Sequence, residues 1–107
     1  MKTWDSYVEQ WLTDPVAAAA YLEAALLEYG EDGQTQAFLL ALGRLVEAQG
    51  GVGALARKSG LNRQHLYRIL SGSGNPTWSS IQAIIRALGM GFSVHPLPSP
   101  QKKAAST

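Results

Sequence analysis

The sequence predicts an all-α domain of five or six helices that ends in one short strand. Apolar residues recur at three- and four-residue spacing along most of the chain, cap residues stand ahead of these segments, and glycines follow them. The chain has 107 residues, of which 46% are hydrophobic. That length allows one domain with a modest core and is too short for two ordinary domains.

Two helices are expected in the first third of the chain, at residues 3–12 and 15–29. Asp14 followed by Pro15 is typical of a helix start, with proline at the first helical position. The glycine and acidic residues from Gly30 to Gly33 are expected to break the second helix. We interpret residues 1–33 as an N-terminal helical extension packed on the same core.

Residues 34–96 are expected to form the second part of the fold. Asn62 and Thr77 are the expected caps of two of its helices, because their side chains can accept from free N–H groups. The predicted helices span about residues 34–49, 52–59, 62–71 and 77–88, with Phe38, Leu42, Leu45, Val46, Leu66, Ile69, Ile84 and Ile85 among the core residues.

A short strand is expected at 91–95, and the tail at 97–107 is expected to be disordered. Residues 91–95 alternate in hydrophobicity, whereas the tail is rich in proline, lysine and small residues. One strand cannot satisfy its own backbone hydrogen bonds. The strand therefore predicts association with a second copy or with another protein.

Charge is divided sharply between the two halves, although the formal net charge is only +1. Residues 1–49 hold all eight acids and two bases, a net charge of −6. Residues 50–107 hold seven bases and no acid, a net charge of +7. A carboxylate near a phosphate-binding face would repel DNA, so this division favours a polyanionic partner for the second half.

Several classes of protein are disfavoured by the composition. There is no cysteine, no apolar N-terminal leader and no apolar run of the ~18 residues that span a bilayer, so we expect a cytoplasmic protein without membrane contact. His65 and His95 have no Asp or Glu in their half of the chain to complete a metal or acid–base site. We therefore expect no enzyme, no metal and no cofactor.

Residues 52–71 have the spacing of two helices that meet over a tight turn. A small residue, Ala56, stands where the second helix would cross, and Gly60 suits the left-handed turn. Leu61, Leu66 and Ile69 would point inward. The pattern predicts a DNA-binding helix-turn-helix and makes residues 34–96 the helix-turn-helix DNA-binding domain. A plain corner between two helices is the alternative.

The outer face of 62–71 carries the side chains that pair with base edges. Arg63 and Gln64, near the start of the helix, are the first candidates for base readout. Lys58 could equally belong to a solvated face, and Tyr67 could be a packing residue. The full prediction is base readout by Asn62, Arg63, Gln64, Tyr67 and Arg68, and phosphate contact by Arg57, Lys58, Ser71 and Asn75.

Residues 52–88 resemble the lambda-repressor-like helix-turn-helix class (Cro/C1, or XRE). From about residue 12 to 96 the chain also resembles the addiction-module antidote family, the HigA-like "DNA-binding prophage protein" group. Trp78 stands where this pattern more often has an aliphatic residue, and Ser79-Ser80 replaces an acidic first turn. The resemblance rests on Asp14-Pro15, the run 17–26, Phe38-Leu39-Leu40-Ala41-Leu42, Leu55-Ala56-Arg57, Leu66-Tyr67-Arg68 and Gly74-Asn75-Pro76-Thr77.

The resemblance implies an antitoxin that binds a small toxin of the RelE/ParE superfamily. It also implies a homodimer that represses its own operon at a palindromic operator, with Arg63, Gln64, Tyr67 and Arg68 on the recognition helix. A stand-alone prophage-type regulator and a helical adaptor that binds only protein are the alternatives. Trp4, Tyr7 and Trp11 are either part of a partner-binding surface or, as we favour, core residues packed on the alanine-rich helix.

Overall fold

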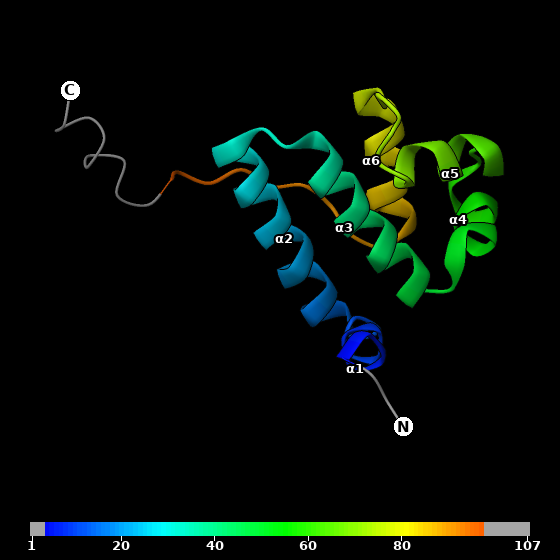
Figure 1. The fold of residues 1–107 in the computed structure, drawn as a ribbon, viewed down its shortest axis with the longest axis horizontal. Coiled ribbons are helices and arrows are strands. Elements are labelled where there is room, and N and C mark those ends of the chain that lie inside the picture. The colour runs from blue at the N-terminus through cyan, green and yellow to red at the C-terminus, as the bar shows by residue number, and fades with distance from the viewer. Residues whose placement is uncertain (1–3, 98–107) are drawn as a thin grey trace, which may run out of the picture.

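A computed structural model describes residues 4–97, with side chains from Tyr7 onward except at residue 9. Six α-helices follow one another in this part of the chain (Figure 1). Their bounds are α1 Trp4–Trp11, α2 Pro15–Asp32, α3 Thr35–Ala48, α4 Gly51–Ser59, α5 Arg63–Leu70 and α6 Trp78–Ala87. The all-α class and the number of helices are as predicted.

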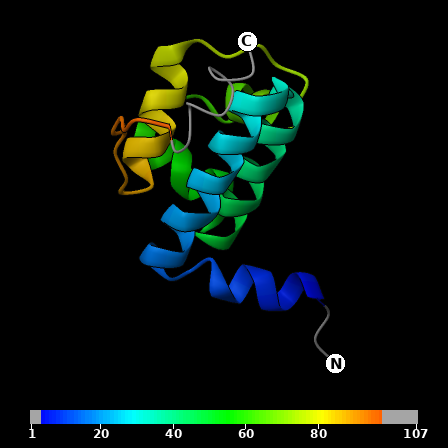
Figure 2. The same cartoon turned by 90° about the vertical axis from the view of Figure 1, so that its left-hand side faces the viewer.

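Helices α2 and α3 form an antiparallel pair, and α1 lies across one end of it (Figure 2). The predicted start of α2 is confirmed, because Asp14 Oδ2 accepts from the Ala17 N–H at 2.9 Å and Pro15 is the first helical residue. The predicted break at Gly30 is wrong. A glycine inside a helix costs only about 1 kcal/mol, and α2 continues to Asp32 before Gly33 ends it with φ 68°.

One hydrophobic core joins all six helices. Leu12, at the end of α1, is fully buried, and Ala18 and Leu22 bring α2 into the same cluster. The predicted core residues of α3, α5 and α6 are confirmed. The fully buried large side chains are Leu12, Leu39, Leu42, Leu45, Val46, Leu66, Ile69, Ile84 and Ile85.

The favoured interpretation of the N-terminal aromatic residues as core is wrong for the two that can be placed. Tyr7 and Trp11 are 56% and 52% exposed, and the side chain of Trp4 lies outside the described ones. The main contacts of α1 are with α3. Leu12 makes the attachment instead, and its carbonyl accepts from Gln49 Nε2 at 2.9 Å.

The predicted strand at 91–95 is absent from the described part of the chain. These residues form an irregular segment after α6, and within residues 4–97 there is no second strand to receive their backbone hydrogen bonds. The predicted tail begins at Leu97, and its remaining residues, 98–107, lie outside those that the structure describes.

Within residues 4–97 no single helix is long and apolar enough to cross a membrane. Helices α3 and α4 meet that requirement only as a pair, and they are bent by 96° at their junction. Both helices bury apolar side chains in the core, among them Leu42, Leu45 and Leu55.

Candidate nucleic-acid interface

Helices α4 and α5 are joined by a turn of three residues, Gly60 to Asn62, and α5 runs across the end of α4 rather than alongside it (Figure 1). Gly60 has φ 77°, the left-handed conformation predicted for it. Asn62 Oδ1 accepts from the His65 N–H at 2.9 Å, which confirms the predicted cap. The turn therefore follows from two residues that are visible in the sequence, Gly60 and Asn62.

Helix α5 is held from one side only. Leu66, Ile69 and Leu70 are buried in the core, while the predicted readout residues lie on the opposite, exposed face. Gly43 of α3 lets α5 approach closely, because a Cβ at Gly43 would lie 3.1 Å from the Leu70 carbonyl oxygen. The exposed face carries Asn62, Arg63, Gln64, Tyr67 and Arg68.

Two of these five side chains have partners within the protein. Asn62 serves the cap, so its Oδ1 is already engaged. The Arg63 guanidinium lies against the first turn of α4, where a Cβ on Gly53 would be 2.9 Å from Arg63 Nη2. Sequence reasoning missed this role of Gly53, because the two residues are ten positions apart and on different helices.

Tyr67 combines the two alternatives considered for it. Its side chain is 55% exposed, and it also lines a hollow of about 370 Å³ between α3 and α5 together with Leu40 and Leu70. It therefore stands at the edge of the α5 face, beside α3.

The predicted phosphate-binding residues do not form one cluster. Arg57 and Lys58 are exposed in the last turn of α4, but Lys58 lines a small hollow with residues of α3 and α6 and none of α5. The Ser71 hydroxyl donates to the Arg68 carbonyl at 2.9 Å. Asn75 is exposed in the loop before α6.

The half of the chain that contains α5 has no acidic side chain, because no Asp or Glu follows Glu47 in the sequence. Glu47 is the acidic residue closest in sequence to this unit, and its Oε1 would lie 3.9 Å from a Cβ placed on Gly51. A carboxylate is stabilised at a helix N-terminus, so Glu47 suits the start of α4. The backbone N–H groups at the start of α4 therefore have an acidic neighbour.

His65 connects α5 to α6. Its Nε2 lies 3.4 Å from the hydroxyl of Ser80, a buried residue. The Ser80 backbone N–H donates to Oγ1 of Thr77 at 3.2 Å, which confirms Thr77 as the predicted cap. The histidine therefore positions the recognition-helix candidate against α6. Within the described residues no three His, Cys, Asp or Glu side chains gather in a way that could hold a metal ion.

Comparison with known proteins adds the family. A family model described as "Probable addiction module antidote protein" matches residues 2–96. The chain belongs to this family. A protein of Haemophilus influenzae (strain Rd) is 32% identical over 90 residues, which cover 84% of this chain and 88% of that protein, and it is described as an uncharacterized protein. No solved structure matches.

Membership in the antidote family confirms the resemblance at the level of the family. It implies a toxin partner of some kind. The HigA-like and XRE assignments, the RelE/ParE type of the toxin and the binding of DNA remain predictions.

Proposed function

We propose that this antidote-family protein is an antitoxin that binds DNA through the α4–turn–α5 unit and represses its own operon. The observation that carries the proposal is the exposed face of α5, where arginine, glutamine and tyrosine side chains stand on a helix anchored by Leu66 and Ile69. Arginine and glutamine form bidentate pairs with guanine and adenine in the major groove. The face is exposed to solvent, and readout is the function that its residue types suit.

Arg63 and Gln64 are proposed for base readout because the first turn of a recognition helix faces the groove in this docking mode. Tyr67 and Arg68, one turn later, would contact a base or the backbone. Two copies related by a two-fold axis would place two α5 helices in successive major grooves, about 34 Å apart. We therefore propose a homodimer on a palindromic operator.

We propose that the protein partner is a small toxin of the RelE/ParE superfamily, in keeping with the antidote family. The acidic half of the chain is a poor DNA surface and suits a basic protein partner. Both roles are binding functions, and we propose no catalytic step.

The test measures binding to the promoter upstream of this gene by fluorescence anisotropy, with wild-type protein and the variants Gln64→Ala and Arg63→Ala. Each variant is expected to lose about 1–3 kcal/mol on its preferred sequence and to relax preference at one base position. Arg86→Ala is the matched control, because it removes an exposed arginine of the same half of the chain from α6. Unchanged affinity and preference in both α5 variants would contradict the assignment.

Two alternatives are separated by co-expression with the small protein encoded beside this gene. A stoichiometric complex that rescues growth from a lethal neighbour supports the antitoxin. Specific promoter binding without such a complex would leave a stand-alone regulator. A complex without salt-dependent DNA affinity would leave a protein-binding adaptor.

A further inference from the structure

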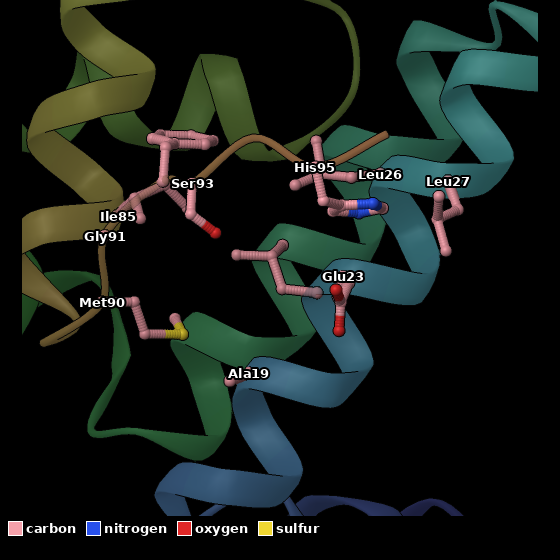
Figure 3. A pocket seen from close by; sticks show the side chains of 11 residues that line it. Ala19, Glu23, Leu26, Leu27, Ile85, Met90, Gly91, Ser93 and His95 are labelled. Carbon is pink, nitrogen blue, oxygen red and sulfur yellow. The ribbon is translucent and has the colours of Figure 1, made fainter. Parts of the chain in front are cut away.

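A groove of about 340 Å³ runs between α2 and the segment that follows α6 (Figure 3). One face of α2 forms its first wall, with Leu22, Glu23, Leu26 and Leu27, and residues 90–95 form the second. Leu22 is buried and belongs to the core, whereas Leu27 is 45% exposed. The groove thus has an apolar floor that is continuous with the core and an accessible apolar rim.

The second wall offers backbone groups as well as side chains. Within residues 4–97 the structure contains no backbone hydrogen bond to or from residues 91–95. Gly91 leaves open space beside this wall, because a Cβ there would meet nothing within 4 Å. A segment with free N–H and C=O groups beside an apolar groove can accept an extended peptide by strand addition.

Phe92 keeps this wall in place. Its ring packs on Trp78 of α6, with ring centroids 4.9 Å apart and planes inclined by 42°. The wall is therefore attached to the folded domain by this ring contact and by the Met90 N–H, which donates to the Ile85 carbonyl at 3.1 Å.

The charge of the first wall narrows the choice of occupant. Helix α2 contains four acidic residues, Glu23, Glu28, Glu31 and Asp32, and no Lys, Arg or His. All four are exposed, and Glu23 lines the groove itself. The opposite wall contains only one ionisable side chain, His95. Glu23 would therefore attract a cationic occupant at the groove itself.

A second copy of this chain is the less suitable occupant. In a two-fold interface the same patch faces itself, so the acidic α2 helices of the two copies would lie near each other. Like charges brought together in this way oppose association.

We infer that the groove between α2 and residues 90–95 receives an extended, cationic segment of the partner protein. This inference rests on the antitoxin function proposed above and assigns the surface on which the partner docks. One apolar side chain of the segment enters between Leu26, Leu27 and Met90, its backbone pairs with residues 91–95, and a lysine or arginine side chain lies against Glu23.

The test compares groove variants with matched controls on the same helix. Leu27→Asp and Glu23→Lys change the groove at exposed side chains outside the core. Val16→Asp and Glu28→Lys are the controls, because they make the same changes on α2 outside the groove. The Val16 side chain is 77% exposed, and Glu28 lines a different hollow, beside α3. Urea unfolding of each variant confirms that it is folded. Affinity for the protein encoded beside this gene, promoter affinity and oligomeric state are then measured for all five proteins.

Both groove variants are expected to bind the partner roughly tenfold more weakly or worse, with promoter affinity unchanged and both controls like wild type. Amide exchange at 91–95 is expected to slow when the partner binds. If the groove variants bind the partner as tightly as wild type does, the inference about the groove is wrong and the proposed antitoxin function is unaffected. A wild-type protein that binds its promoter but not the neighbouring protein overturns both. Groove variants that become monomers yet still bind the partner would assign the groove to a second copy and overturn the inference.

Discussion

At the scale of single residues, Asn62 has two roles. Its Oδ1 accepts from the His65 N–H and so begins α5, and the same residue stands at the proposed DNA face. A side chain that is engaged in a cap is held in one orientation, which limits the base edges it can reach. We therefore assign Asn62 a structural role first, and Arg63 and Gln64 the main part of readout.

Asn62→Ala is expected to lower the free energy of unfolding by about 0.5–2 kcal/mol, because the first turn of α5 loses its side-chain acceptor. Asn62→Asp is expected to preserve stability, since aspartate caps equally well, and to weaken promoter binding by placing a carboxylate against phosphates. Urea unfolding and fluorescence anisotropy measure the two effects. An aspartate variant that binds the promoter as tightly as wild type would show that Asn62 lies away from the DNA.

At the scale of elements, α1 is attached to the core by Leu12, the residue that follows it, and Tyr7 and Trp11 are exposed. Leu12 is fully buried and Gln49 holds its carbonyl, while Trp11 beside it is 52% exposed. The N-terminal helices are consequently part of the core, and removal of residues 1–33 would also remove Ala18 and Leu22 from it. We expect such a truncated chain to fail to fold.

Leu12→Ala is expected to cost about 2–5 kcal/mol of unfolding free energy, because it leaves a cavity where α1 meets α3. Trp11→Ala is expected to change stability by no more than about 0.5 kcal/mol, since the side chain is largely in solvent. Urea denaturation curves of the two variants give the comparison. A Trp11 variant that is destabilised as much as the Leu12 variant would mean that the tryptophan is packed after all.

The glycines of α2 and α3 make a second comparison at this scale. Gly30→Ala is expected to stabilise the protein by about 0.5–1 kcal/mol, because a Cβ there meets nothing within 4 Å and alanine favours the helix. Gly43→Ala is expected to destabilise it by about 1–3 kcal/mol, because the Cβ would lie 3.1 Å from backbone of α5. Thermal unfolding of both variants is the measurement. Equal stabilisation by the two substitutions would show that α5 can move away from α3 at little cost.

At the scale of the whole molecule, the chain separates its charges along the sequence. Residues 1–49 carry a net −6 with eight acids and two bases, and residues 50–107 carry +7 with seven bases and no acid. The α4–turn–α5 unit lies in the second half, and the apolar groove has its acidic wall in the first. The separation suits a protein that would hold DNA and a cationic partner on different surfaces.

Promoter affinity is expected to fall steeply with salt, with log K linear in log salt and a slope of about −0.9 for each phosphate neutralised. Arg68→Ala is expected to make that slope shallower by about 1, because the variant neutralises one phosphate fewer than the wild-type protein. Glu31→Ala, on the acidic half, serves as the control and is expected to leave the slope unchanged. Affinity that does not vary between about 50 and 200 mM salt would exclude phosphate binding as the source of the interaction.

Local sequence features alone determined where α2, α5 and α6 begin and which residues of α3, α5 and α6 enter the core. Asp14, Asn62 and Thr77 act as caps within three residues of their partners, and the spacing of Leu66 and Ile69 is read along one helix. These effects involve residues that are close in the sequence, so they can be predicted from the sequence alone.

Only the tertiary structure decided which of two apolar faces is buried and which distant residues meet. It buried Leu12 instead of Trp11, placed Gly53 beneath Arg63, and left residues 91–95 irregular beside α2. Each of these outcomes depends on the relative position of helices that are far apart in sequence. Helical periodicity indicates which face of a helix is apolar, but the packing of the whole chain determines which neighbour covers that face.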